Sequence, residues 1–275
     1  RYPAWNMLDW ANMDSPSGCA STHENVLMVE ALRRAACLAD IAGSQEADFL
    51  RREADALVRA VNKMLWDEEK KAYIDSIHPD GTRSTVFSQQ SQVMAYLCGC
   101  VPESGLADVC KNIKDAPEGW VKIGSPWMMW FSFEALAKMG DFETLLEWTR
   151  KYWGQMLELD ATTCWETFPI WAQGRWWPSR SWCHAWSAAP TYFLSAYQLG
   201  VRPIEAGYGK AEVSPVPAGL KWAKGRVPTP FGAIVVSWKV TDGRFDITIL
   251  HPEEIEIEFK LPGNYQPGKV DIIKS

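Results

Sequence analysis

The sequence lacks the features that mark several large classes of protein. No apolar run approaches the roughly 18 to 20 residues that a membrane-spanning helix needs, so an integral membrane protein is not expected. No block of Lys and Arg is present and the formal net charge is −6, which disfavours a surface for nucleic acid or for an anionic membrane. Hydrophobic residues make up 47% and charged residues 23% of the 275 residues, the balance of a folded globular protein.

Several catalytic signatures are also missing. The sequence has no G-x-S-x-G motif, no phosphate-binding glycine loop and no C-x-x-C pair. No spacing of His, Cys and acidic residues resembles a zinc site, so neither a metal nor a cofactor is implied. The 7 cysteines are irregularly spaced and make a poor disulfide framework, which favours a reducing cytoplasm as the compartment.

The first two-thirds of the sequence is patterned as helices that follow one another in pairs. Residues 26–42 and 44–65 carry apolar residues near helical spacing, and the stripes expected to be buried are Leu27, Ala31, Leu38, Ile41 and Leu50, Leu57, Val61, Met64. Further helices are expected over 88–99, 103–113, 126–139, 142–157 and 183–199. Because the loops between them are short, neighbouring helices should pack as antiparallel hairpins.

The pattern changes to short strands after residue 203. Residues 233–240 and 244–250 are rich in β-branched and aromatic residues and flank Thr241-Asp242-Gly243, which is typical of a β-hairpin with an Asp-Gly turn. Residues 255–259 alternate strictly between apolar and polar, as a half-buried strand does. The sequence therefore predicts a mainly α region over 1–203 and an all-β module over 204–275.

Tryptophan is unusually abundant and is concentrated in one part of the chain. Of the 16 Trp, eleven fall between Trp120 and Trp186. Aromatic faces pack against the C–H faces of sugar rings, so such a cluster is typical of a carbohydrate site. A Trp-rich core between helices is the other interpretation, and we expect it for about half of these residues.

Two titratable side chains lie within this cluster. Glu166 stands between Trp165 and Phe168 in a segment without helical or strand periodicity, where desolvation against indoles can tune a general acid or base. A Glu that caps or salt-bridges a neighbouring helix is the equally favoured alternative. His184, expected in the first turn of a helix, could bind a sugar hydroxyl or orient Glu166, although a structural His is favoured over both.

Acidic residues elsewhere carry weaker signals. Asp9 and Trp10 place an acid beside an aromatic near the start of the chain, as in a sugar-binding clamp. Four other acids adjoin helical or turn patterns and are expected to be solvated or to cap helices, namely Glu24, Asp67, Asp75 and Glu134.

Three ordered motifs resemble a known family. The runs DATTCWE (160–166), CHAWSAAP (183–190) and LGVRP (199–203) are similar to the C-terminal half of bacterial α-L-rhamnosidases, glycoside hydrolase family 78. Residues 220–230, which resemble that family's passage into its terminal β domain, and 62–67 fit the same pattern. The resemblance extends over nearly the whole chain.

The resemblance implies part of an (α/α)6 toroid followed by an antiparallel β-sandwich. It also implies inverting hydrolysis of terminal α-L-rhamnose, in which one carboxylate activates water and a carboxylic acid protonates the leaving oxygen. Glu166 matches the general base of the family, and His184 matches a histidine that contacts the sugar. The other residues expected to bind the substrate are Trp10, Asp9, Trp165 and Trp66.

One family element has no counterpart here. The general acid of the family lies in an acidic stretch upstream of the Leu-Asp-Trp motif, and a closed toroid needs twelve helices where about seven are expected. The expected partners are therefore a rhamnose-containing carbohydrate and a missing N-terminal part of the same protein. Unpaired apolar helix faces also favour association, including homo-oligomers. The alternatives are another hydrolase on the same toroid and a non-catalytic carbohydrate-binding or structural remnant.

Overall fold

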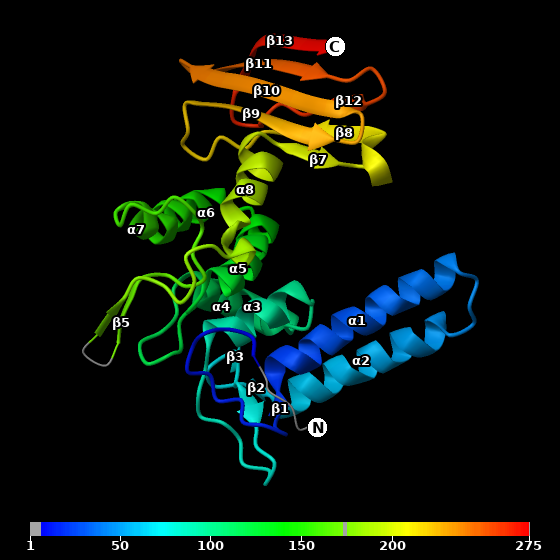
Figure 1. Ribbon diagram of the computed structural model, residues 1–275. Coiled ribbons are helices and arrows are strands. Elements are labelled where there is room, and N and C mark those ends of the chain that lie inside the picture. The colour runs from blue at the N-terminus through cyan, green and yellow to red at the C-terminus, as the bar shows by residue number, and fades with distance from the viewer. Residues whose placement is uncertain (1–6, 173–174, 275) are drawn as a thin grey trace. The chain divides into compact units, whose positions relative to one another are not determined.

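The chain folds into two compact units. The computed structural model describes residues 7–172 and 175–274 (Figure 1). The first unit, here called the helical unit, comprises Arg1–Asp141 and Gln155–Ser187. The second, the sheet unit, comprises Phe142–Gly154 and Ala188–Ser275. The expected domain boundary at residue 203 stays a prediction.

The helical unit begins with a long helical hairpin. Helix α1 (Thr22–Ile41) and helix α2 (Ala47–Met64) lie side by side, as expected from their sequences (Figure 1). Ser21 caps α1 by accepting the backbone N–H of Glu24, and its hydroxyl donates to the Glu24 carboxylate at 2.8 Å. Glu24 is exposed and its carboxylate supports the capping hydroxyl, so its expected place at a solvated helix start is confirmed. None of the helices in the described part of the chain is long and apolar enough to cross a membrane.

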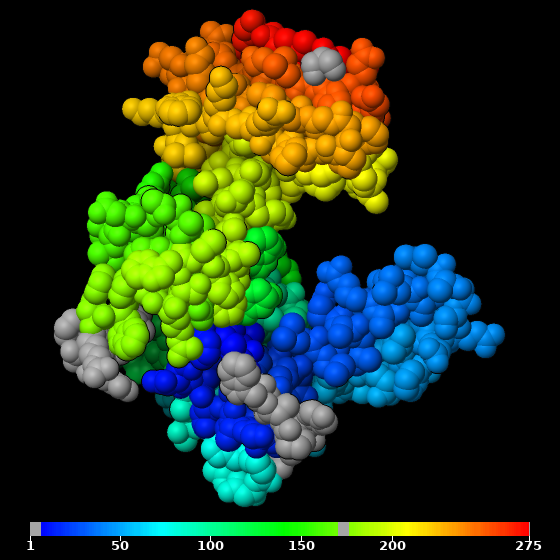
Figure 2. All heavy atoms as spheres, viewed as in Figure 1, coloured from blue at the N-terminus to red at the C-terminus, as the bar shows by residue number. Residues whose placement is uncertain are grey.

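The buried face of this hairpin differs from the expected one. Helix α1 buries Val26, Val29 and Ala36, whereas Leu38 and Ile41 are 66% and 84% exposed. Leu27 in α1 and Met64 in α2 are also exposed, so the stripes expected from the sequence are wrong at these positions. Leu38 and Ile41 are exposed because the hairpin extends from the rest of the helical unit (Figures 1 and 2) and contacts it at the end where α1 begins and α2 ends. At that end Asn62 of α2 donates to the Cys100 carbonyl at 3.0 Å.

The remaining elements of the helical unit are short. In chain order they are β1 (Ala20–Ser21), β2 (Trp66–Asp67), β3 (Ala72–Tyr73), β4 (Ser76–Ile77), α3 (Gln89–Leu97), the 3-10 turn η1 (Glu103–Gly105), α4 (Leu106–Lys114), α5 (Pro126–Met139), β5 (Ile170–Ala172), β6 (Arg175–Trp177) and the 3-10 turn η3 (Ala185–Ser187). Helices α3, α4 and α5 pack around a core that includes the fully buried Val93, Ile113 and Met128.

Helix α5 starts and ends at the expected residues. The Ser125 hydroxyl accepts the backbone N–H of Met128, and Pro126 occupies the first turn, where a missing N–H costs nothing. At the other end Gly140 adopts φ +75°, which a side chain would disfavour. These local signals fix the position of α5 independently of its packing.

Two long helices expected from the sequence are interrupted in the structure. Over 142–157 the chain forms α6 (Phe142–Trp148), a π-helical turn η2 (Thr149–Trp153) and α7 (Gly154–Leu157). The Thr149 hydroxyl donates to the carbonyl of Leu145 at 2.9 Å, a side-chain bond that loosens the regular backbone ladder.

The expected helix over 183–199 is broken in a similar way. It begins as η3, continues as α8 (Ala189–Phe193), and ends as the π-helical turn η4 (Leu194–Gln198). Ala188 has ψ +13° and lies outside the helix, and Pro190 restarts it in the next turn. His184 consequently precedes a 3-10 turn instead of lying in the first turn of a long helix.

The sheet unit contains two β-sheets. A four-stranded sheet has the order β13-β11-β10-β9, formed by β9 (Trp222–Thr229), β10 (Gly232–Thr241), β11 (Arg244–His251) and β13 (Gln266–Lys274). A three-stranded sheet has the order β12-β8-β7, formed by β7 (Val201–Pro203), β8 (Lys210–Val213) and β12 (Glu256–Phe259). A short 3-10 turn, η5 (Ala206–Tyr208), joins β7 to β8.

The expected hairpin and strand are both present. Strands β10 and β11 are antiparallel, and Asp242 and Gly243 between them have φ +48° and +75°, as a tight hairpin turn requires. Strand β12 covers the alternating residues 256–259. The module is not wholly antiparallel, because β13 joins β11 and β12 joins β8 in parallel. Each of these strands returns to its sheet through a longer connection instead of a hairpin.

Residues from both sheets form one core. Val236, Trp238 and Phe245 of the larger sheet are buried with Ala211 and Val213 of the smaller one. A core shared by two facing sheets is that of a β-sandwich, which confirms the expected architecture. Along each strand the alternate residues face away from this core.

Gly200, at the entry to this sandwich, lies where no side chain fits. Its φ is +81°, and a Cβ atom would stand 2.2 Å from the backbone carbon of Ser214. Gly207 has a similar φ of +78°, but no atom lies within 4 Å of an added Cβ. A side chain at Gly207 would therefore strain the backbone without a steric clash. We expect Gly207→Ala to lower the free energy of unfolding by about 1 kcal/mol and Gly200→Ala by more than about 3 kcal/mol. Urea denaturation followed by circular dichroism checks this, and equal losses would contradict it.

Candidate active site

The Asp9 carboxylate joins three segments of the helical unit. Asp9 is 7% exposed, and its Oδ1 accepts its neighbour's N–H, that of Trp10, at 2.8 Å and the Ser125 hydroxyl at the start of α5. Its Oδ2 accepts Gln90 Nε2 from α3 and the backbone N–H of Gly124, both at 2.7 Å. The carboxylate thus receives four hydrogen bonds, three of them from groups at least 81 residues away in the sequence.

Burial dominates the titration of this carboxyl. Desolvation raises the pKa of Asp9 above its ordinary value, although the hydrogen bonds from Ser125, Gly124, Gln90 and Trp10 act in the opposite direction. Both oxygens are already occupied by protein donors. Asp9 therefore fixes the backbone of Trp10 against the start of α5.

The Trp10 side chain lies next to two other site features. The guanidinium carbon of Arg180 is 4.0 Å from the centroid of the Trp10 ring, a cation–π distance. A Cβ atom at Gly124 would stand 2.1 Å from the Trp10 carbonyl oxygen, so the close approach of these two segments requires glycine. Trp10 is half-buried, as a ring that lines a cleft would be.

Glu166 is held by its backbone and not by its carboxylate. Its N–H donates to the carbonyl of Ser181 at 2.9 Å, and its carbonyl accepts the indole N–H of Trp186 at 2.8 Å. The side chain is half-buried, and no hydrogen bond or ion pair of its carboxylate is found within 7–172 and 175–274. The expected loop is confirmed, and the alternative of a Glu that caps or salt-bridges a helix is not what these residues show.

His184 lies beside the same tryptophan. Its ring centroid is 4.2 Å from that of Trp186, and its backbone N–H donates to the carbonyl of Cys164 at 2.8 Å. Its Nδ1 is buried and meets no hydrogen-bond partner among the residues described. Trp186 also packs against Trp127 of α5, with the ring centroids 5.9 Å apart.

These contacts close into a ring. Asp9 binds the start of α5, Trp127 of α5 touches Trp186, and Trp186 touches His184 and the Glu166 carbonyl. From Glu166 the chain of contacts returns through the segment of Ser181 and Arg180 to Trp10. The structure therefore brings four of the six expected site residues into one cluster: Asp9, Trp10, Glu166 and His184.

The other two expected residues have different surroundings. Trp165 is 2% exposed, and its ring packs edge-on against Trp182 at 4.8 Å, so it belongs to the core behind Glu166. Trp66 contacts Tyr73 at 5.0 Å and donates its indole N–H to Glu68 at 2.6 Å. Among the described residues no hydrogen bond or ring contact joins Trp66 to the cluster.

Sequence reasoning missed several residues of this region. Trp186 and Arg180 connect the cluster. Trp186 lies in the CHAWSAAP motif but was not expected to contribute to the site, and no sequence signal points to Arg180. Asp75 was expected to be solvated or to cap a helix. The expectation that it is solvated is wrong, because Asp75 is fully buried. It accepts the hydroxyls of Ser88 and Ser91 at the start of α3, and burial raises its pKa. No group of three or more His, Cys, Asp or Glu in the described ranges is arranged to hold a metal ion.

Family models match both parts of the chain. The model of the bacterial α-L-rhamnosidase six-hairpin glycosidase domain matches residues 1–197, and that of the bacterial α-L-rhamnosidase C-terminal domain matches residues 200–272. Together the two models describe a six-hairpin glycosidase domain followed by a C-terminal domain. The chain belongs to the bacterial α-L-rhamnosidase family.

Individual relatives agree with this assignment. An α-L-rhamnosidase of Alteromonas sp. (strain LOR) is 33% identical over 133 residues, which are 45% of this chain and 14% of the relative. The crystal structure of a GH78 rhamnosidase of Bacillus sp. GL1 is 45% identical with a TM-score of 0.93, covering 99% of this chain and 29% of that protein. An α-L-rhamnosidase of Streptomyces avermitilis, complexed with L-rhamnose, shares the fold at 18% identity and a TM-score of 0.72, over 96% of this chain and 25% of its own.

The hydroxyl of Ser125 offers a test of the Asp9 anchor. Since the pKa of Asp9 is raised, the stability tied to its proton is present below the ordinary pKa and lost as the pH rises through the raised one. Ser125→Ala removes a donor to the ionised form, so we expect a loss of about 1.5–3 kcal/mol near pH 7 and about 1 kcal/mol near pH 4. Urea denaturation at both values measures it.

Ser132→Ala is the matched control for this variant. Ser132 is buried in the same helix and donates to the Met128 carbonyl at 3.2 Å without touching Asp9. Its loss of stability should not depend on pH. A pH-independent loss for Ser125→Ala as well would contradict the anchoring role of the hydroxyl.

Proposed function

We propose that this chain is the base-bearing part of an inverting α-L-rhamnosidase that releases terminal α-L-rhamnose. The family membership supports the substrate class, since the Streptomyces relative binds L-rhamnose. The observation that carries the proposal is the state of Glu166. Its backbone is bonded on both sides while its carboxylate has no partner among the described residues.

Glu166 is the proposed general base. A carboxylate beside indoles and free of protein partners can accept a proton from water and direct the oxygen at the anomeric carbon. The backbone hydrogen bonds of Glu166 to Ser181 and Trp186 fix the backbone from which this carboxylate projects. The preceding residue, Trp165, is buried and anchors the same loop in the core. The departing glycosidic oxygen needs a proton from a separate carboxylic acid.

Three other residues have proposed roles around the sugar. Trp10 offers an aromatic face to the C–H side of the ring, and His184 offers a ring nitrogen to a hydroxyl. Asp9 contributes by holding Trp10 in place, because its own oxygens already accept four hydrogen bonds. Trp66 would contribute at the periphery of the site.

The general acid is proposed to come from outside these 275 residues. The chain spans 29% of the length of the Bacillus rhamnosidase and 14% of the Alteromonas relative. The exposed apolar residues of α1 and α2 provide a surface for such a segment, or for a second copy of the chain.

Substitution of Glu166 tests the base. In the chain combined with the upstream part of its parent protein, we expect Glu166→Gln to lower kcat on an aryl α-L-rhamnoside by about 10² to 10⁴-fold. Glu158→Gln is the control, because Glu158 is an exposed glutamate directly after α7 and none of the site contacts described above involves it. Activity of the isolated 275-residue chain would contradict the external acid, and an unimpaired Glu166→Gln would contradict the base.

The first product reports the stereochemistry. An inverting enzyme releases β-L-rhamnose before mutarotation, and proton NMR in the first minutes of reaction distinguishes the two anomers. Release of the α anomer would contradict inversion. Sugar binding without turnover in the complete protein would instead favour a non-catalytic carbohydrate-binding role.

Trp10 should act on binding more than on chemistry. Because its ring packs on the sugar in ground and transition states alike, we expect Trp10→Ala to raise KM about tenfold with a smaller change in kcat. Trp177→Ala removes an exposed indole in β6 and should leave both constants near their original values. Steady-state kinetics on the same rhamnoside measures the split, and a loss confined to kcat would contradict this role.

A further inference from the structure

One face of the four-stranded sheet carries an exposed tryptophan among cations. In β9 the buried positions alternate with exposed Trp222, Lys224 and Arg226. The inner side of this strand packs closely, because a Cβ atom at Gly225 would stand 2.3 Å from Leu199 Cδ1. The outward side is open, and Trp222 is 68% exposed, more than Trp182 at 56% or Trp177 at 49%.

The strand register places these residues in rows across the sheet. Trp222 lies opposite Lys239 of β10, and Lys239 lies opposite Asp246 of β11. Asp246 is held in turn by β13, since its Oδ1 accepts the backbone N–H of Lys269 at 2.7 Å. The next row contains Lys224, Ser237, Thr248 and, on β13, Asp271. One outward face therefore presents an indole, ammonium groups, hydroxyls and two carboxylates at adjacent positions.

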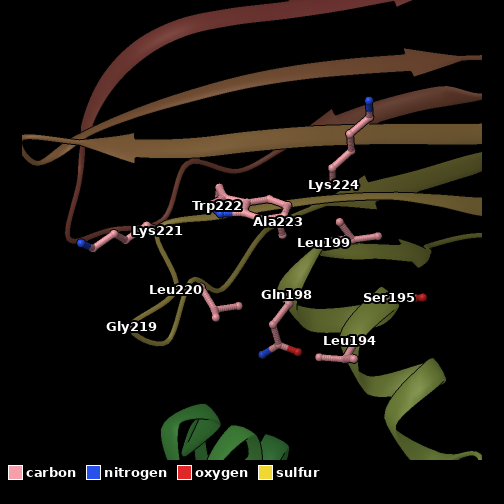
Figure 3. A pocket seen from close by; sticks show the side chains of 10 residues that line it. All are labelled: Leu194, Ser195, Gln198, Leu199, Gly219, Leu220, Lys221, Trp222, Ala223 and Lys224. Carbon is pink, nitrogen blue, oxygen red and sulfur yellow. The ribbon is translucent and has the colours of Figure 1, made fainter.

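Two hollows lie along this face and share residues. One, of about 360 Å³, is lined by Trp222, Lys224 and Ser237 among others. The other, of about 300 Å³, shares Lys239, Asp246 and Lys269 with it. The two form one trough, defined here as the Trp222 trough. A further hollow, of about 630 Å³, lies at the start of β9 on the opposite side of the strand, where Leu199 and Gln198 are among its lining residues and away from which Lys224 points (Figure 3).

Cations outnumber acids in the Trp222 trough. Its lining contains two acids, Asp242 and Asp246, and four cations: Lys224, Lys239, Lys269 and Arg244. Lys239 pairs with Asp246 at 3.5 Å and Lys269 with Asp271 at 2.7 Å. The ammonium group of Lys224 forms no ion pair with a described carboxylate. A cationic trough in a chain with a net charge of −6 attracts a negatively charged ligand to one place.

We infer that the Trp222 trough is a second carbohydrate-binding site, which takes a polysaccharide bearing carboxylate or sulfate groups. A sugar ring stacks on Trp222, and an acidic substituent is bound by Lys224 and Lys239. The hydroxyls of the neighbouring units face Ser237 and Thr248. Nucleic acid also combines anions with stacking rings, but the carbohydrate follows from the proposed rhamnosidase function of the chain.

Titration calorimetry on the 275-residue chain tests this inference. The probes are polygalacturonate for carboxylate, dextran sulfate for sulfate, neutral dextran, and duplex DNA. We expect binding to at least one of the two acidic polysaccharides, weakened by salt because the contacts are ionic. Which of the two binds identifies the acidic group. The readout is binding and not turnover, so a failure of this inference is distinguishable from a failure of the proposed function.

The variants are matched to exposed residues elsewhere. Trp222→Ala and Lys224→Glu should each weaken binding about tenfold. Phe231→Ala, an exposed aromatic in the β9–β10 turn, and Lys63→Glu in α2 should not. If Trp222→Ala fails to fold, the binding loss of Lys224→Glu alone tests the inference. Absence of binding, equal binding of neutral dextran, equal losses in the controls, or tighter Trp222-dependent binding of DNA would overturn the inference.

Discussion

The burial of one carboxylate, that of Asp9, organises the helical unit around the candidate site. Removing a carboxylate from water is expensive, and the cost is offset only when hydrogen-bond donors surround it. Here the donors come from Gln90, from the Gly124–Ser125 start of α5 and from Trp10. Because α5 also carries Trp127, the same anchor sets the position of Trp186 and, through its indole N–H, the backbone of Glu166. A change at Asp9 would therefore reach Glu166 without touching it.

Elements with local signals were predictable from the sequence, and burial was not. Ser125, Pro126 and Gly140 define the ends of α5 through their own backbone chemistry, and Asp242-Gly243 defines a hairpin turn in the same way. The apolar stripe of α1 carries no such information about its partner. Leu38 and Ile41 have the spacing of buried residues, yet nothing in the described part of the chain covers them. The interruptions of the later helices depend on single side-chain bonds and on Pro190, which average periodicity does not detect.

The candidate site was predictable as a set of motifs but not as a geometry. Glu166 and His184 stand out because the runs around them resemble a family, and the structure brings both against Trp186. The sequence could not separate Trp165, which supports the loop from the core, from an indole that faces a ligand. It also could not show that Asp75 is buried. The hydroxyls that Asp75 accepts come from Ser88 and Ser91, which are 13 and 16 residues away in the sequence. These distinctions arise from tertiary packing, to which no single residue pattern is sensitive.

The sheet unit shows why net charge is a poor guide to a local surface. Because side chains alternate along a strand, Trp238 lies in the sandwich core while the adjacent Lys239 faces outward. Alternate residues of one strand therefore contribute to the core and to the trough. A chain with a net charge of −6 can thus present a cationic face.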